Sequence, residues 1–390
     1  MKKVFLLLLT FFFCLSFCFG TEFLWEGEIR TRTANYSYIS TLDDQISLID
    51  TRVRLFTTAT FSENLKAVVG LEIGDFEWGN DDHNADYENV ETKNAYLEFT
   101  PEMINILKFR VGLQSYADPF GSAVFDEDAA GIMVMPELDS FNMNAGIFVL
   151  EDDDVVSQST TFGVMDLSKN INKLFLKGSF YYFQMRNLYS KFYTGIGADY
   201  ILNDAFKLGG HFLYMGVKQD PDKGDYTAKG YFAYLFGEYT NNKFSAKLNF
   251  GYSPADYIAD DPLYFSGIIP YPYLYGLEFF FPGDIYDDNA YQMNYGSAPT
   301  MGSLGSMVIS ANLNYDFLFA NVGMVNTSNQ NNFYEGSLMG TEIDLGIDYQ
   351  LTEGLNFKAV YAIFMVGDYF DTWGNYDNKS ELSTQLIYKF

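Results

Sequence analysis

The arginines of this chain are concentrated near its start and recur at every second position. Five of the six arginines precede residue 111, and acidic residues share their parity. In an extended strand, side chains of one parity lie on one face. Such a face could orient charged or dipolar solutes. Its members are Glu26, Glu28, Arg30, Arg32, Arg52, Arg54, Lys108 and Arg110.

Acidic residues of opposite sign follow in a predicted loop, 117–130, which carries Asp126, Glu127 and Asp128. If this loop folds toward the arginines, its carboxylates would face their guanidinium groups across a narrow gap. Opposite charges on the two sides would create an electric field across the gap, as in the constriction of a channel. The alternative is that the arginines only pair with acids on neighbouring strands, namely Glu26, Glu28, Glu72 and Glu98. Further carboxylates on a distant wall, at Glu342, Asp344, Asp348 and Asp316, would favour cations.

Catalytic and metal-binding groups are scarce. The two histidines, His83 and His211, lack an accompanying nucleophile motif, so we expect no enzyme. Cys14 and Cys18 both fall in residues 1–20, which have the features of a secretory signal peptide. The mature chain, 21–390, would then contain no thiol. Four acidic clusters could hold calcium ions shared with lipopolysaccharide. None has the ligand spacing of an EF-hand, so we expect no metal or cofactor. The clusters are Asp81–Asp82, Asp152–Asp154, Asp220/Asp222/Asp225 and Asp287–Asp288.

Strict alternation of apolar and polar residues over segments of about ten residues predicts the elements that position these charges. In residues 341–350, Ile343, Leu345 and Ile347 alternate with acidic residues. A lipid-facing charge costs about 2–4 kcal/mol at the bilayer midplane, so the charged face must line a lumen. We predict eighteen strands, near 22–36, 50–61, 65–78, 90–100, 106–116, 130–136, 141–150, 158–168, 173–187, 191–202, 205–219, 227–240, 243–253, 307–318, 320–327, 338–350, 355–369 and 379–390.

The predicted fold class is an all-β, transmembrane antiparallel barrel of about 18 strands, within a range of 16–18. Short turns alternate with long loops, which is typical of periplasmic turns and extracellular loops, and an even strand number puts both termini in the periplasm. First and last strands should pair, because an open edge is costly in hydrocarbon. The longest loop, 254–306, is rich in Tyr and Phe, which could stack on sugars or pack among themselves as a cap.

Composition excludes several other classes. The 390 residues are 48% hydrophobic and 18% aromatic, with a formal charge of −27. Mean hydropathy is −0.07, and the only long apolar run is the signal, which excludes a bundle of membrane helices. Acidity of this degree argues against nucleic acid as a partner, and the aromatic content argues against disorder.

The chain resembles Gram-negative porins, both the general porins and the alginate-export-like group. The resemblance is carried by 50–55, 62–67, 71–79, 94–97 and 109–114, and by the terminal Phe390, which is similar to the signal that the outer-membrane assembly machinery reads. Resemblance to general porins implies that Asp126, Glu127 and Asp128 face Arg30, Arg32, Arg52 and Arg54, and that the protein forms trimers.

The sequence therefore predicts a porin of the bacterial outer membrane that passes small hydrophilic solutes and ions by diffusion. Its expected partners are outer-membrane lipid, lipopolysaccharide, the assembly machinery and further copies of the chain. The alternative function is a channel specific for an oligosaccharide or an alginate-type polymer.

Overall fold

The computed structural model describes most of the mature region of the chain. It covers residues 21–37, 45–79, 90–138, 140–151, 160–185, 189–219, 227–254, 272–278, 305–327, 336–369 and 378–390. The predicted signal peptide, both cysteines, His83 and the four acidic clusters lie outside these residues. Within the described part, no helix is long and apolar enough to cross a bilayer.

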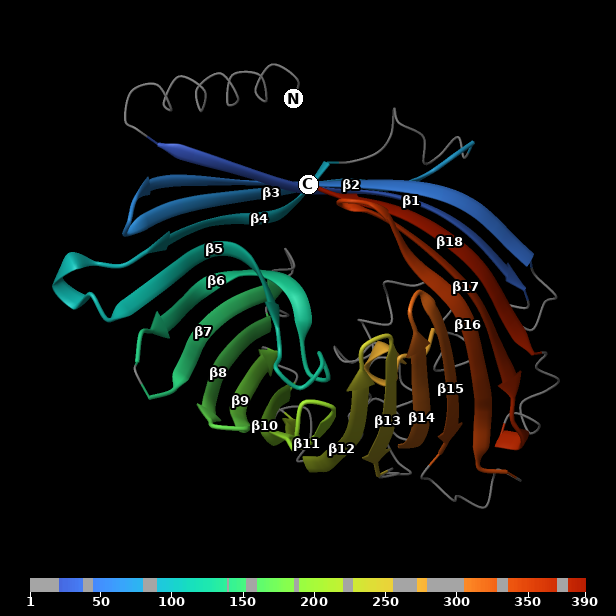
Figure 1. Ribbon diagram of the computed structural model, residues 1–390. Coiled ribbons are helices and arrows are strands. Elements are labelled where there is room, and N and C mark those ends of the chain that lie inside the picture. Colours follow the sequence, from blue (N-terminus) through green and yellow to red (C-terminus); the bar gives the residue numbers. More distant parts are fainter. Residues whose placement is uncertain are drawn as a thin grey trace.

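Eighteen antiparallel strands form one closed sheet, as the alternation predicts (Figure 1). Each strand pairs with its neighbour in sequence, and β1 pairs with β18, which closes the barrel. The strands are β1 (Glu22–Ser37), β2 (Gln45–Ser62), β3 (Leu65–Glu77), β4 (Val90–Phe99), β5 (Leu107–Ala117), β6 (Asp126–Pro136), β7 (Asn142–Glu151), β8 (Thr160–Ile171), β9 (Leu174–Met185), β10 (Tyr189–Ile201), β11 (Phe206–Gln219), β12 (Thr227–Asn241), β13 (Phe244–Ser253), β14 (Ser306–Tyr315), β15 (Leu318–Asn326), β16 (Leu338–Thr352), β17 (Leu355–Val366) and β18 (Lys379–Lys389). Two short 3₁₀ helices, η1 (Glu102–Ile104) and η3 (Pro272–Tyr275), lie between strands.

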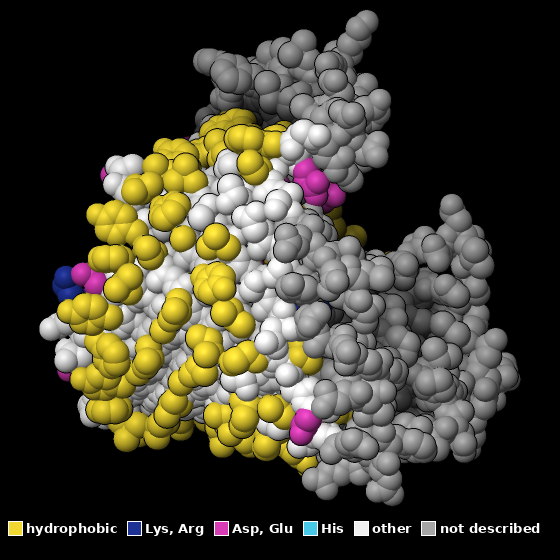
Figure 2. All heavy atoms as spheres, turned by 90° about the vertical axis from the view of Figure 1, so that its right-hand side faces the viewer, with side chains coloured by type: hydrophobic (Ala, Val, Ile, Leu, Met, Phe, Trp, Pro, Cys, Tyr) yellow, Lys and Arg dark blue, Asp and Glu magenta, His cyan; other side chains and the backbone are white. Residues whose placement is uncertain are grey.

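The outer face of the barrel is apolar, and the buried charged residues of the wall lie on the inner face. On β16, Ile343 and Leu345 are 41% and 54% exposed, whereas their neighbours Glu342 and Asp344 are fully buried. Figure 2 shows hydrophobic side chains gathered over the outer wall, with charged side chains sparse among them. This distribution is the one expected of a barrel whose outer surface meets hydrocarbon and whose interior holds water.

The two ends of the barrel differ in their connections. One end has tight turns, several of which contain a residue with positive φ: Asn172, Asn242, Asp316 and Gly354. The other end carries the long connections. The start of β1 and the C-terminal Phe390 lie at the end with tight turns, where Gly27 and Phe390 exchange two backbone hydrogen bonds of 3.0 and 3.1 Å.

The β5–β6 hairpin bends away from the wall into the barrel. β5 pairs with β6 along its whole length but with β4 only from Phe109 to Leu113. β6 in turn pairs with β7 only from Ala130 to Val134. The residues nearest the tip of this hairpin therefore pair with no wall strand on either side. Figure 1 shows this part of the hairpin inside the ring of strands.

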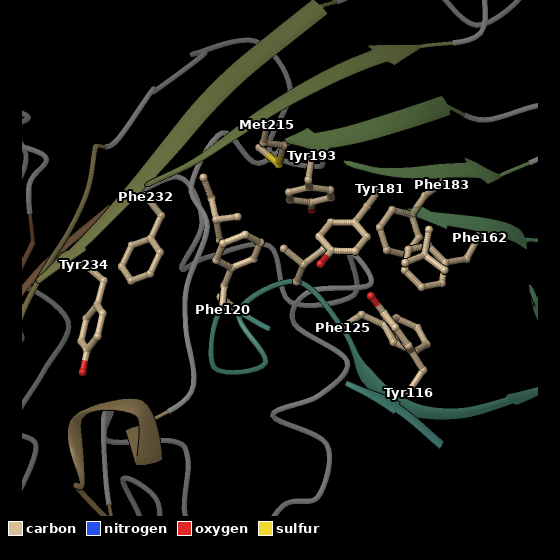
Figure 3. Packing of buried hydrophobic residues seen from close by; sticks show 14 of the residues in the cluster. Tyr116, Phe120, Phe125, Phe162, Tyr181, Phe183, Tyr193, Met215, Phe232 and Tyr234 are labelled. Atoms are coloured by element: carbon tan, nitrogen blue, oxygen red, sulfur yellow. The ribbon is translucent and has the colours of Figure 1, made fainter. Parts of the chain in front are cut away.

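An aromatic core fixes the tip of the hairpin against the inner wall. Phe120 and Phe125, both from the tip, are 0% and 2% exposed and lie among side chains of β7–β12 (Figure 3). The ring of Phe125 stacks on that of Phe162 at 4.5 Å, and Phe162 stacks on Phe183 at 4.3 Å. Burial of this apolar surface holds the hairpin in the lumen.

Two predicted strand starts differ from the structure by four or more residues, and one predicted lumen residue lies elsewhere. β2 begins at Gln45, and β6 begins at Asp126, so the predicted loop 117–130 is confined to 118–125. Asp126, Glu127 and Asp128 are strand residues, because their backbone continues the pairing with β5. Asp316 is not on the lumen wall: it lies in the β14–β15 turn, where its carboxylate pairs with Lys243 at 2.6 Å.

Candidate functional site

The basic residues of β1 and β2 lie side by side on the inner wall. The register places Glu28 opposite Arg54, Arg30 opposite Arg52, and Arg32 opposite Asp50. Opposed residues of an antiparallel pair share a face, so these charges form one ladder along the lumen. Arg110, from β5, continues it beyond β4.

Each arginine of this ladder takes part in an ion pair, and several of these pairs run diagonally to the strand register. The Asp50 carboxylate pairs with the guanidinium groups of Arg30 and Arg32, with N–O distances of 3.3 and 2.6 Å, and Asp50 is 1% exposed. Arg52 pairs with Glu28 at 3.3 Å. The remaining ion pairs are Arg54 with Glu72, Arg110 with Glu98 at 2.8 Å, and Lys108 with Glu137 at 3.2 Å. The ladder therefore alternates in sign rather than forming an unbroken basic strip.

The hairpin and the ladder enclose a pocket of about 340 Å³. Asp126, Glu127 and Asp128 lie on its hairpin side, and Arg52 and Arg54 on its wall side, so the structure brings these predicted groups together. Phe56, Glu72, Lys93 and Ser115 complete the lining. Lys93 connects the two sides: its Nζ is 3.6 Å from Asp128 and 3.7 Å from Glu72.

The lining of the pocket includes both the negative and the positive groups of the predicted electric field. Carboxylates on the hairpin face guanidinium groups on the wall, as the eyelet hypothesis requires. Ion pairs with Glu28, Glu72 and Glu98 are also present, as the alternative hypothesis requires. The two hypotheses are compatible for Arg52 and Arg54, which pair along the wall and also line the pocket; Arg30 and Arg32 pair with Asp50 and are not part of the lining.

Asp118 holds the tip of the hairpin in shape. Its carboxylate accepts hydrogen bonds from the backbone N–H groups of Phe120, Val124 and Phe125 at 2.7, 2.7 and 2.9 Å. Burial raises the pKa of Asp118 to about 6, against the lowering effect of these bonds. Lys177, on the wall, donates to the carbonyl oxygen of Pro119 at 2.6 Å, which fixes the tip to β9.

A second inserted segment, residues 272–278 of the longest loop, lies on the opposite part of the inner wall. We call it the strap. Tyr275 and Leu277 of the strap are 0% and 4% exposed and belong to the same buried cluster as Phe120. Figure 1 shows η3, which begins the strap, inside the ring near β13 and β14. A Cβ atom added to Gly121 would lie 2.5 Å from Leu274 Cδ1, so hairpin and strap are in contact.

The three predicted lumen acids of β16, Glu342, Asp344 and Asp348, share one face of the strand but differ in burial. Glu342 and Asp344 are fully buried there, and Glu342 accepts the backbone N–H of Glu278 at 2.6 Å. Asp348 lies farther along β16, is exposed, and accepts from Asn356 at 2.6 Å. Glu381 of β18, which is 8% exposed, adds a further lumen carboxyl group.

His211 faces the interior but has no catalytic arrangement. Its ring packs against Phe120, Phe232 and Tyr234 at 5.4, 5.6 and 4.9 Å. Over the described ranges, no group of three or more His, Cys, Asp or Glu residues is placed to hold a metal ion.

Sequence reasoning missed four groups that build the site: Asp50, Lys93, Asp118 and the strap residue Glu278. Asp50 shares the parity of Arg52 and Arg54, so that signal was available. Lys93 sits where the β3–β4 register shifts, which breaks simple alternation. Asp118 and Glu278 act through loops, for which period-two patterns give no information.

Solved structures with the same architecture are outer-membrane channels. OccK9 (OpdG) of Pseudomonas aeruginosa superposes with a TM-score of 0.62 at 10% identity, covering 95% of this chain and 98% of that one. OccAB4 of Acinetobacter baumannii gives 0.59 at 15% identity, with coverages of 95% and 98%. OpdK of P. aeruginosa, solved with vanillate, gives 0.57 at 12% identity, with coverages of 94% and 98%.

The fold is that of an outer-membrane porin. At these identities the likeness concerns the fold alone. The similar structures are channels of the Occ and OprD type rather than enzymes, and membership of the alginate-export-like group is not supported. No protein-family model matches the chain, and no curated protein is significantly similar to it in sequence.

Proposed function

We propose that the protein is a porin of the bacterial outer membrane, through which small hydrophilic solutes and ions diffuse passively. The observation that carries the proposal is a closed barrel whose lumen is narrowed by an inserted hairpin facing a charged ladder. Eighteen strands enclose an aqueous lumen. Catalysis has no part in this proposal, because transport through such a pore requires only a path and a field.

The hairpin would determine which path is open. Its tip packs on β7–β12 through apolar side chains, which excludes water from that side. Solutes would therefore pass on the side of β1–β5, between Arg52 and Arg54 on the wall and Asp126 and Asp128 on the hairpin. A field between fixed charges of opposite sign orients dipolar solutes.

A second candidate is a channel selective for small carboxylates. The pocket contains Arg52, Arg54 and Lys93, whose cationic groups suit a carboxylate. OpdK, which has this fold, was solved with vanillate. An alginate-type or oligosaccharide channel is less well supported, because two inserted segments narrow the lumen and acids alternate with its arginines.

Planar-bilayer recording of the purified protein tests the proposal. We expect steady ohmic steps; absence of any conductance would rule out both candidates. Saturable block of the current by a small carboxylate would favour the second candidate.

The double variant Arg52→Gln/Arg54→Gln should shift the reversal potential in a KCl gradient toward cation preference. Lys108→Gln is a control, because it removes a wall charge that pairs with Glu137 away from the pocket. An unchanged reversal potential in the double variant would exclude the field assigned to this pocket.

We further propose that Phe390 serves as the assembly signal, that both termini face the periplasm, and that the barrel forms a homotrimer. Phe390 directly follows β18 at the seam with β1, where an assembly factor would reach it before closure. Chemical crosslinking in outer membranes, followed by mass determination, tests the trimer. Deletion of Phe390 should slow appearance of the folded band on cold SDS gels.

A further inference from the structure

The inner wall hydrogen-bonds the peptide groups of the strap as well as packing against its side chains. The carbonyl oxygen of Tyr275 accepts hydrogen bonds from Ser310 Oγ at 2.8 Å and Asn312 Nδ2 at 2.9 Å, with Asn249 Nδ2 at 3.5 Å. All three donors are buried in the lumen wall. Three side-chain donors therefore converge on one carbonyl oxygen, which has two lone pairs.

The wall also recognises the other groups of a peptide. Glu342 accepts the backbone N–H of Glu278 at 2.6 Å, and Lys358 Nζ lies 3.1 Å from the Glu278 carboxylate. The wall thus provides donors for a carbonyl, an acceptor for an N–H and a cation for a carboxylate. Together these groups make a site for a peptide with an acidic side chain or terminus.

Two glycines give this site its shape. A Cβ atom at Gly323 would lie 2.5 Å from Leu277 Cδ1, and one at Gly251 would overlap the ring of Tyr275. Gly323 and Gly251 therefore form notches into which Leu277 and Tyr275 fit. A side chain larger than hydrogen at Gly323 or Gly251 would prevent Leu277 or Tyr275 of the strap from docking there.

We propose that the inner wall of β12–β17 is a binding site for short acidic peptides, and that the strap occupies it as a displaceable ligand in cis. This inference rests on the proposed channel function and goes beyond it. The strap mimics the solute: it places a carbonyl, an N–H and a carboxylate on complementary groups of the wall. A peptide that enters the lumen competes with the strap for these groups, and release of the strap widens the path.

Accessibility of a single thiol tests the docking of the strap. Ser310→Cys places a thiol beneath Tyr275, in a mature chain expected to have no other cysteine. We expect slow reaction with a small charged methanethiosulfonate reagent in the full-length folded barrel. Adding Leu277→Ala or Gly323→Val should accelerate labelling by about tenfold or more, which corresponds to about 1.4 kcal/mol of lost docking. Gly163→Ala is the matched control, since a Cβ there would meet only Tyr182 O, at 3.8 Å.

A peptide in trans tests the ligand class. The heptapeptide with the sequence of residues 272–278, with blocked termini, should slow labelling of Ser310→Cys/Leu277→Ala and reduce its current, and a scrambled heptapeptide should do neither. Unchanged labelling in both release variants, or no protection by the heptapeptide, would overturn the inference. Labelling does not depend on conduction, so a barrel that labels as expected but conducts nothing would refute the channel function alone. Migration of the folded band on cold SDS gels establishes that each variant has folded.

Discussion

Asp50 is the acidic residue on which the first rungs of the ladder depend. It is 1% exposed and accepts from both Arg30 and Arg32. We expect Asp50→Asn to lower the free energy of unfolding by about 1–3 kcal/mol, because a charged acceptor is lost from two buried guanidinium groups. Urea unfolding in lipid vesicles measures this change. Glu26→Gln, which changes an exposed acid of the neighbouring strand β1, should have little effect, and equal destabilisation by the two variants would contradict this role.

Asp118 should make the hairpin tip sensitive to pH. Burial raises the pKa of Asp118 from 3.8 to about 6, so the docked tip binds a proton more readily than a released tip. Its protonation stabilises docking fully below about pH 4, and this contribution is lost as pH rises to about 6. We expect current fluctuations from the hairpin to increase over this interval and then level off.

The variant Asp118→Asn separates this titration from others in the lumen. An asparagine side chain keeps one acceptor oxygen and turns its NH₂ group toward backbone N–H donors. We therefore expect a looser tip at every pH and no change in fluctuations between pH 4 and 6. Single-channel recording across this range provides the measurement. A variant that retains the pH response of the wild type would assign it to another group.

Among the elements, the β5–β6 hairpin has the largest influence on the lumen. Phe120 anchors its tip: the ring is fully buried and lies 5.4 Å from the His211 ring, with Lys177 Nζ 5.3 Å from its centroid. Phe120→Ala should remove about 3–5 kcal/mol from docking of the tip and so raise mean conductance. Phe244→Ala, on the outer face beside a turn, is the control and should leave conductance unchanged. Equal conductance in both variants would show that the tip does not limit the path.

The hairpin also shows where sequence patterns stop being informative. Alternation predicts the wall strands because each has one face in lipid and one in water. From Asp126 to Ala129, β6 has no strand partner other than β5 and both its faces lie inside the barrel, so the apolar face that would mark a strand is missing. The longest loop, 254–306, likewise has no period, and its aromatics suggested a cap or a sugar-stacking surface. Of this loop, the strap packs against the lumen wall, and residues 255–271 and 279–304 lie outside the described residues.

On the scale of the whole molecule, the longest connection between strands is strongly acidic in sequence. Residues 254–305 contain seven acidic residues and no basic residue. They connect β13 to β14 at the end of the barrel that carries the long connections. We expect this mouth to favour cations at low ionic strength and to lose that preference near 1 M KCl, where the screening length falls to about 3 Å. Reversal potentials measured at a fixed KCl ratio over a range of mean concentrations test this; a constant selectivity would place its origin in the ladder.

Closure of the barrel joins the two extremes of the chain. The hydrogen bonds between Gly27 and Phe390 span almost the full sequence, so their formation carries the largest loop-closure entropy of any strand pairing here. Until β18 has been made and delivered, β1 retains an open edge that can pair with other chains. Closure at the β1–β18 seam therefore requires the full set of strands. A chain that lacks one strand cannot close its barrel, and we expect it to be lost to proteolysis or aggregation before it forms an open pore in the membrane.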